Sequence, residues 1–191
     1  MSHPWFDDPI PGPDAATLAA AHERQAQLTK PPGSLGRLER LGATLAAMQG
    51  TQQPRLDQVW ISVFAADHGI VAEGVSAFPQ VVTAEMVRNF ARGGAAISVL
   101  AQEWNARLEV VNVGTVQALG DLPGVLDARI AAGTANFVHE PAMSVEQLHD
   151  ALTAGREAAE RASIGGARLF IGGEMGIGNT TSAAAVACSL L

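Results

Sequence analysis

A glycine-rich segment near the end of the chain has the composition of a ligand-binding turn. Residues 168–187 read RLFIGGEMGIGNTTSAAAVA, which is a short apolar run, four glycines and a small-residue stretch typical of a helix. A turn between a strand and a helix lies at the carboxyl end of the strand, where open α/β sheets bind ligands. Asn179, Thr180 or Thr181 is expected to cap the helix, and the free amides at its start attract a phosphate group.

The pattern of this turn differs from the common phosphate-binding motifs. No lysine follows the last glycine, as a Walker A loop requires, and the glycines at 172, 173, 176 and 178 do not fit GxGxxG. An ordinary tight turn before a capped helix is therefore the competing interpretation. Glu174 favours a ligand site, because a carboxylate within an anion-attracting loop is better explained by hydrogen bonding or proton transfer to a ligand than by packing.

A second polar pair follows another apolar run. Residues 59–66 (VWISVFAA) are typical of a strand covered on both faces, and Asp67 and His68 come directly after it. These side chains suit a metal or acid–base pair, or hydrogen bonds that support the loop backbone. No further His or Cys cluster follows, so no metal site is predicted. Residues 70–80 form a long irregular segment, which at this edge of a sheet is typical of a binding loop.

Composition narrows the class of protein. The 191 residues are 48% hydrophobic and carry a net charge of −7, which argues against a nucleic-acid surface. The single cysteine, Cys188, allows no internal disulfide, favours a reducing cytoplasm and lies in an alanine-rich stretch expected to be buried. We see no signal peptide at the N-terminus and no apolar run of about 20 residues that would span a membrane.

The order of predicted elements indicates an α/β fold with a mostly parallel sheet. Helices are expected over 15–28, with Asp14 as cap, and after Ser34, with a buried stripe of Leu38, Leu41, Leu45 and Met48. The remaining elements are strands at 59–66, 108–113 and 168–172 and helices at 83–91, 95–104, 144–162 and from about 179. Thr83 and Ser144 are expected to cap the helices that they begin. Residues 117–127 are expected to form a loop, and 128–138 are left unassigned. We expect an N-terminal arm and helical subdomain over 1–50, and an α/β domain over 51–191 that is incomplete at its C-terminus.

Several segments together resemble one family, the nicotinate-nucleotide–dimethylbenzimidazole phosphoribosyltransferases of cobalamin biosynthesis. They are long, they follow the order of the family's motifs, and they extend from about residue 28 to the end of the chain. These segments are KPPGSLGRLE (30–39), ADHGI (66–70), VSAFPQVVTA (75–84), VG (113–114), GTAN (133–136), PAMS (141–144) and GEMGIGNTT (173–181).

The resemblance implies a fold, a reaction and roles for residues. It implies a Rossmann-like domain with a small helical domain, usually in a homodimer. The chemistry of the reaction requires no metal, because the leaving pyridinium already carries its charge, and we expect no cofactor. The implied reaction moves the ribosyl 5-phosphate of nicotinate mononucleotide to 5,6-dimethylbenzimidazole, giving α-ribazole 5-phosphate and nicotinate. Phosphate and nucleotide binding fall to Gly173, Gly176, Gly178, Asn179, Thr180 and Thr181, and the base pocket to Ser76, Phe78, Pro79, Gln80, Met86 and Met175. Glu174 corresponds to a carboxylate close to the substrates, and Asp67 and His68 support the loop.

The chain departs from the family pattern in one respect. It lacks the C-terminal Gly-Glu-Gly motif whose glutamate is the family's presumed general base. We therefore expect the N-terminal part of such an enzyme. The alternative is a non-catalytic or partner-dependent module that binds a nucleotide or benzimidazole. A third possibility is a related transferase that uses another aromatic acceptor, such as adenine or a phenol.

Overall fold

The computed structural model describes residues 5–191, and these form two compact units. The first unit ends at Leu56 and the second comprises Asp57–Leu191. The boundary between the two domains that the sequence indicates, between residues 50 and 51, stays a prediction.

The first unit contains two helices that pack on each other through alanines. A short 3-10 helix, η1 (Trp5–Asp7), precedes α1 (Ala15–Gln27) and α2 (Arg37–Gln49). Asp14 caps α1 as predicted, because its carboxylate accepts a hydrogen bond of 2.7 Å from the amide of Thr17. The small core consists of Ala21, Ala43 and Ala46, with Leu18 partly buried against them.

The prediction of a buried leucine stripe on α2 is wrong. Leu38, Leu41 and Met48 are 66%, 54% and 68% exposed, whereas the alanines at 43, 46 and 47 are at most 2% exposed. The face with the alanines lets the two helix backbones approach closely. Ser34 is likewise not the cap of α2, because the chain turns into the helix at Gly36, whose φ of 55° is accessible to glycine.

The second unit is built on a parallel sheet. The strands are β1 (Val59–Ala66), β2 (Arg107–Gly114), β3 (Val125–Asp127) and β4 (Leu169–Met175), in the order β3-β2-β1-β4. The predicted α/β fold with a mostly parallel sheet is confirmed, since all three strand pairings are parallel. The core on one face of the sheet comprises Ile61, Val63, Ala65, Val87, Ala101 and Val110.

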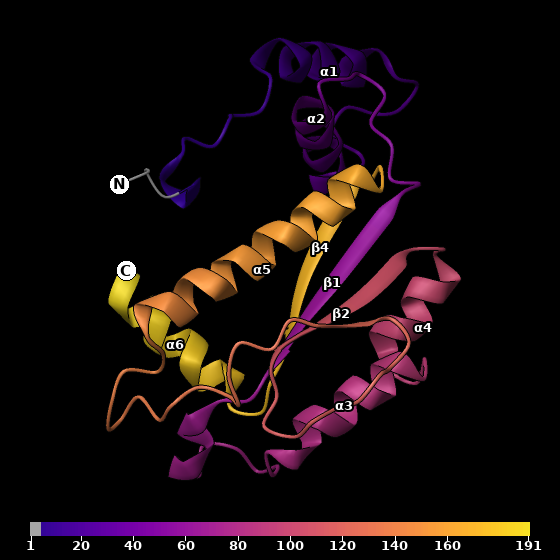
Figure 1. Cartoon of the computed structure of the whole chain (residues 1–191). Coiled ribbons are helices and arrows are strands. Elements are labelled where there is room, and N and C mark those ends of the chain that lie inside the picture. Colours follow the sequence, from indigo (N-terminus) through magenta and orange to yellow (C-terminus); the bar gives the residue numbers. More distant parts are fainter. Residues whose placement is uncertain (1–4) are drawn as a thin grey trace. The chain divides into compact units, whose positions relative to one another are not determined.

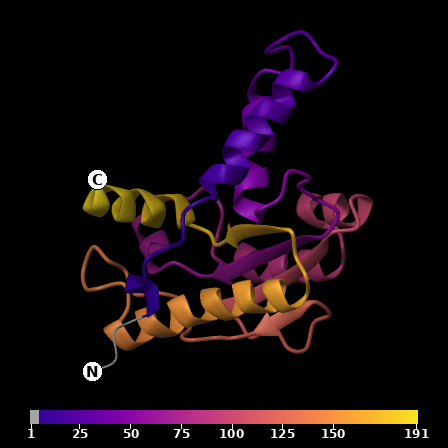
Figure 2. The same ribbon diagram turned by 90° about the horizontal axis from the view of Figure 1, so that it is seen from above.

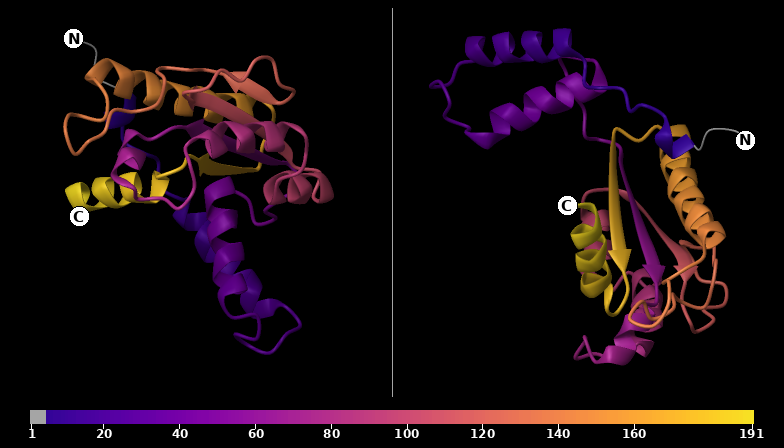
Figure 3. Two further views of the ribbon diagram at one scale, coloured as in Figure 1. Left: turned by 90° about the horizontal axis from the view of Figure 1, so that it is seen from below. Right: turned by 90° about the vertical axis from the view of Figure 1, so that its left-hand side faces the viewer.

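Helices cover both faces of this sheet. α3 (Val81–Ala91) and α4 (Ala96–Glu103) lie on one face and α5 (Val145–Ile164) runs along the other, as Figures 1 and 2 show. α6 (Asn179–Leu190) follows the edge strand β4 (Figure 3). Ser144 caps α5 as predicted, and its capping box with Gln147 is complete.

Three polar side chains tie α5 to the sheet. Glu109 on β2 lies in register with Ser62 on β1 and accepts a hydrogen bond of 2.7 Å from its hydroxyl. Arg161 on α5 donates from Nε and Nη2 to the same carboxylate, each at 3.2 Å. Although burial raises the pKa of Glu109, the hydrogen bonds from Arg161 and Ser62 outweigh it and hold this pKa below its ordinary value.

The structure corrects the predicted elements at several points. β3 lies inside the segment expected to be a loop, and it is only three residues long. Residues 70–73 of the expected irregular segment belong to a 3-10 helix, η2 (Gly69–Glu73). α3 begins at Val81, so that Thr83 lies inside the helix rather than capping it. Cys188 is exposed, not buried.

β4 also extends further than predicted. It continues beyond Gly172 through Gly173 and Glu174 to Met175, because these three residues pair with Val63 to Ala65 of β1. The hydrogen-bonding ladder of a parallel sheet uses backbone groups alone, and glycine takes part in it. The glycine-rich turn is therefore shorter than the sequence indicates, and Glu174 lies on a strand opposite Phe64.

Candidate functional site

A cavity of about 990 Å³ lies at the carboxyl ends of β1 and β4, beside the first turns of α6. Its walls are mostly apolar side chains from four regions of the second unit, among them Phe64, Val113, Phe137, Met143, Met175 and Val186. Its polar side chains include His68, Thr134, Glu174, Asn179, Thr180 and Ser182. An apolar cavity with a few convergent polar groups is typical of a small-molecule site.

The turn Gly176–Gly178 is packed tightly against the end of β1. A Cβ atom at Gly176 would contact the carbonyl oxygen of Ala66 and lie 2.7 Å from Nε2 of His68. Gly178 has a φ of 86°, and a Cβ there would lie 2.7 Å from Cγ2 of Val71. Both glycines are buried, so the absence of a side chain at each is required by the close approach of neighbouring groups.

The start of α6 differs from the predicted anion site. Gly178 is the N-cap, with no side-chain hydrogen bond, so the predicted caps Asn179, Thr180 and Thr181 lie inside the helix. The prediction of free amides at the start of the helix is also wrong, because these amides donate hydrogen bonds within the protein. These hydrogen bonds run from Asn179 N to Gly176 O (3.0 Å), from Thr180 N to Asn179 Oδ1 (2.8 Å) and from Thr181 N to Gly178 O (3.2 Å).

Glu174 and Asn179 form a polar pair at the cavity. The side-chain amide of Asn179 donates to Oε1 of Glu174, while its Oδ1 accepts from the amide of Thr180. Glu174 is exposed, and both residues line the cavity. The oxygen of a neutral amide thus sits at the helix N-terminus, in the place where the helix dipole favours an anionic oxygen.

His68 joins the end of β1 to α6. Its Nδ1 lies 2.9 Å from Oγ of Ser182, in the first turns of α6. Burial lowers the pKa of His68 below its ordinary value, although the nearby carboxylates of Glu174 and Asp67 act in the opposite direction. The imidazole is therefore neutral at neutral pH, and one ring nitrogen acts as an acceptor while the other carries a proton.

Asp67 holds together two loops next to the cavity. Its side chain is buried, and Oδ2 accepts a hydrogen bond of 2.7 Å from the amide of Val116. Its backbone amide donates to Gly114 O at 2.9 Å, and its carbonyl oxygen accepts from Thr134 N at 3.0 Å. All three of these contacts are with backbone groups of neighbouring segments.

Most residues of the predicted base pocket lie outside this cavity. Ser76, Phe78, Pro79 and Gln80 belong to the segment between η2 and α3, and Met86 lies on α3. Gln80 approaches the end of β1, since its side-chain amide donates to the carbonyl oxygen of His68 at 3.5 Å. Of the six predicted residues, Met175 lines the cavity.

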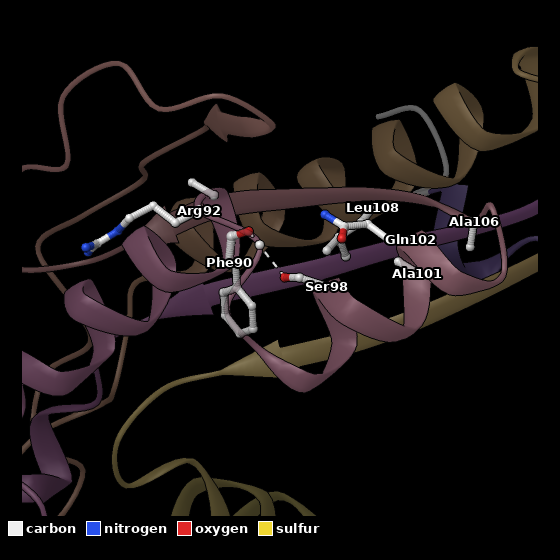
Figure 4. Close-up of a pocket in the computed structure, with 9 residues that line it drawn as sticks. Phe90, Arg92, Ser98, Ala101, Gln102, Ala106 and Leu108 are labelled. Atoms are coloured by element: carbon white, nitrogen blue, oxygen red, sulfur yellow. Dashed lines mark hydrogen bonds between the residues drawn. The ribbon is translucent and has the colours of Figure 1, made fainter.

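A second, smaller cavity of about 300 Å³ lies between the end of α3, α4 and β2 (Figure 4). Ser98 faces it and donates a hydrogen bond of 3.2 Å to the carbonyl oxygen of Phe90. It shares no lining residue with the larger cavity.

Within residues 5–191, no three His, Cys, Asp or Glu side chains gather as they would around a metal ion. No helix in this part of the chain has the length and apolar character needed to cross a membrane.

Sequence reasoning missed two residues at the turn. Thr83 was expected to be a cap, but its hydroxyl accepts a hydrogen bond of 3.1 Å from the amide of Ile177. Ser182 was not singled out, although it lies one helical turn after Gly178 and therefore faces the end of β1. No local pattern indicates the contact of Thr83, because the two partners are 94 residues apart.

Comparisons with known proteins agree on one family. The model of a family described as phosphoribosyltransferase matches residues 10–191. The nicotinate-nucleotide–dimethylbenzimidazole phosphoribosyltransferase of Pseudomonas aeruginosa (strain LESB58) is 60% identical over 191 residues, which is 100% of this chain and 54% of that protein. The protein of the same name from Xanthomonas euvesicatoria pv. vesicatoria (strain 85-10) is also 60% identical, over 100% of this chain and 55% of its own length.

A solved structure shares the fold. The crystal structure of the enzyme of this name from Thermus thermophilus superposes with a TM-score of 0.89 and 51% sequence identity. The match covers 93% of this chain and 54% of that one. The chain thus spans about half the length of the relatives that it matches.

Proposed function

Because this chain belongs to the nicotinate-nucleotide–dimethylbenzimidazole phosphoribosyltransferase family, we propose that it provides binding and catalytic residues for that reaction. The ribosyl 5-phosphate of nicotinate mononucleotide would pass to 5,6-dimethylbenzimidazole, giving α-ribazole 5-phosphate and nicotinate. The observation that carries this proposal is the 60% identity over all 191 residues to a relative of that name. The apolar cavity with Glu174 at the carboxyl ends of parallel strands supports it.

The chemistry is a displacement at C1′ of the ribose. The bond from C1′ to the pyridinium nitrogen breaks, and its electron pair neutralises that nitrogen as nicotinate leaves. A ring nitrogen of the benzimidazole attacks C1′ from the opposite side, and a base removes the proton from the other ring nitrogen. The leaving group already carries positive charge, so the protein's contribution is to hold the phosphate, align the acceptor and accept the proton.

In this proposal Glu174 acts on the incoming base. It is the carboxylate among the residues that line the cavity, and apolar walls next to it suit an aromatic ring. Because Glu174 lies on a strand, the sheet holds its backbone in a fixed position relative to a ring bound in the cavity. Its hydrogen bond from Asn179 orients one oxygen and leaves the other available to accept a proton.

The phosphate would bind at the turn and the start of α6. Gly173, Gly176, Gly178, Asn179, Thr180 and Thr181 remain the proposed residues. The amide of Thr180 now donates to Asn179 Oδ1, so a phosphate oxygen would take the place of that amide oxygen. The helix dipole favours such an exchange, because an anionic acceptor replaces a neutral one.

The remaining proposals come from the family resemblance. The base pocket is proposed to include Ser76, Phe78, Pro79, Gln80, Met86 and Met175. Asp67 and His68 are proposed to support the loops, which agrees with the backbone contacts of Asp67. We also propose a homodimer in the cytoplasm, where a single cysteine and no internal disulfide are usual.

The direct test is turnover by the 191-residue chain. Nicotinate mononucleotide and 5,6-dimethylbenzimidazole are supplied together, nicotinate release is followed, and nucleotide binding is measured by calorimetry. Release that depends on the benzimidazole supports a transferase, and replacing it with adenine or a phenol tests acceptor choice. Binding without release would favour the alternative of a binding module. Absence of both would contradict the proposal.

A further inference from the structure

Thr83 is a buried hydroxyl residue with a partner far away in the sequence. It lies in the first turn of α3 and its side chain is fully buried. The amide of Ile177, in the middle of the turn Gly176–Gly178, donates to its Oγ1 at 3.1 Å. This is a hydrogen bond between the helix that follows Gln80 and the turn that precedes α6.

The three residues of the turn are held in different ways. Gly176 is packed against Ala66 and His68, and Gly178 is packed against Val71. Packing of this kind limits how close the turn can come but does not direct its amides. The hydrogen bond from Ile177 is directional, so it fixes the orientation of the peptide between the two glycines.

The segment Gly176–Gly178 also determines the start of α6. Gly176 O accepts from the amide of Asn179, and Gly178 O accepts from the amides of Thr181 and Ser182. A change in the orientation of the turn would therefore move the donors of the first helical turn. One of those donors is the amide of Thr180, which is proposed above to receive a phosphate oxygen.

We propose that Thr83 is a positioning residue, whose buried hydroxyl fixes the turn Gly176–Gly178 and thereby places the phosphate site relative to α3. The inference rests on the proposed function for its consequence in binding. Thr83 lies three residues after Gln80, at the end of the segment proposed to receive the aromatic base. Its hydrogen bond thus links the two substrate regions, which the reaction requires to be aligned.

Two substitutions separate the hydroxyl from the volume of the side chain. Thr83→Val keeps the shape but removes the acceptor, so the partly buried amide of Ile177 loses its partner. Thr83→Ser keeps the acceptor and loses one methyl group. We expect amide hydrogen exchange at Ile177 to become at least about tenfold faster in Thr83→Val, and the Kd for nicotinate mononucleotide to rise about tenfold. Thr83→Ser should keep both values within about twofold of the wild type.

The two readouts distinguish failure of this inference from failure of the proposed function. Unchanged exchange at Ile177 in Thr83→Val, or equal changes in both variants, would overturn the role of the hydroxyl. Normal nucleotide binding in Thr83→Val despite faster exchange would also overturn the positioning role. A wild-type chain that binds no nucleotide would contradict the proposed function, while exchange still tests the hydrogen bond. Should Thr83→Val not fold, unprotected exchange of Ile177 in the wild type and in Thr83→Ser would overturn the inference.

Discussion

Nδ1 of His68 and Oγ of Ser182 lie 2.9 Å apart, which joins the end of β1 to α6 across 114 positions of sequence. The ring of His68 also fills the space beside Gly176. The histidine therefore contacts both ends of the turn that connects β4 to α6. Its protonation state should consequently affect the stability of the second unit.

The first prediction concerns the pH dependence that His68 confers. Its pKa in the folded chain lies below the ordinary value of 6.5, chiefly because of burial, with Glu174 and Asp67 opposing the shift. Well above pH 6.5 the group is neutral in both states. As the pH falls from 6.5 through the folded pKa, the unfolded chain binds the proton more readily and stability is lost.

This loss can be isolated with His68→Gln, which does not titrate. We expect the free energy of unfolding of the wild type to fall relative to that of His68→Gln between pH 7.5 and about pH 5. Urea unfolding at several pH values measures it, and the other histidines titrate in both chains and cancel. A constant difference between the two chains would contradict the assigned direction of the shift.

The second prediction concerns the volume available at Gly176. A methyl group there would contact Ala66 O and lie 2.7 Å and 2.8 Å from Nε2 and Cδ2 of His68. Gly176→Ala should therefore lower the free energy of unfolding by at least about 2 kcal/mol, because backbone must shift. Substitution at this position tests the fold as well as the proposed phosphate site.

Gly172→Ala is the matched control for Gly176→Ala. It lies on the same segment, and its added methyl would meet only Cε1 of Phe170, at the ordinary distance of 4.0 Å. Gly172→Ala should change the free energy of unfolding by no more than about 1 kcal/mol. Equal destabilisation by the two substitutions would show that loss of glycine flexibility, not the close approach at 176, is responsible.

The third prediction concerns the acid stability provided by Glu109. The hydrogen bonds from Arg161 and Ser62 hold its pKa below the ordinary value of 4.5 in spite of burial. This contribution is complete above pH 4.5 and is lost as the pH falls through the folded pKa. Arg161→Leu removes the ion pair, so acid unfolding should begin at a higher pH.

Arg156→Leu is the comparison for Arg161→Leu. Both arginines lie on α5, but Arg156 pairs with Glu160 where both side chains are about half exposed. An exposed pair of this kind contributes little, so the acid transition should barely move. Circular dichroism from pH 6 to pH 2 measures both transitions, and coincident curves would refute a special role for Glu109.

The sequence predicted strands with long patterns better than strands with short ones. β1 lies in a long apolar run and residues 108–113 of β2 include four apolar residues, so both strands were found, whereas β3 has only three residues and one of them is partly buried. The predicted β4 ends too early, at Gly172, because Gly173 is typical of a turn, although its backbone pairs with Val63 of β1. Local composition does not show which partner a glycine meets.

The site shows the same limit. Glu174 was singled out because a carboxylate within an anion-attracting loop is poorly explained by packing, and Asn179 was one of three possible caps; the structure places both at the cavity. The cap at Gly178 and the donors already used at the start of α6 depend on a φ of 86° and on side-chain orientation. Thr83 is apparent only once α3 and the turn are seen together. Contacts between distant segments are what the sequence alone left out.

The last prediction concerns Glu174 itself. If its carboxylate accepts the proton of the incoming base, Glu174→Gln should lower kcat for nicotinate release by about 100-fold, because an amide cannot act as a base. The Kd for nicotinate mononucleotide should change by less than about threefold, since Gln can still accept the hydrogen bond from Asn179. Glu103→Gln, on the exposed end of α4, is the control and should match the wild type in both. A normal kcat in Glu174→Gln would contradict a role of Glu174 as the base. Its role would then be to orient the side chain of Asn179, and another group would have to accept the proton.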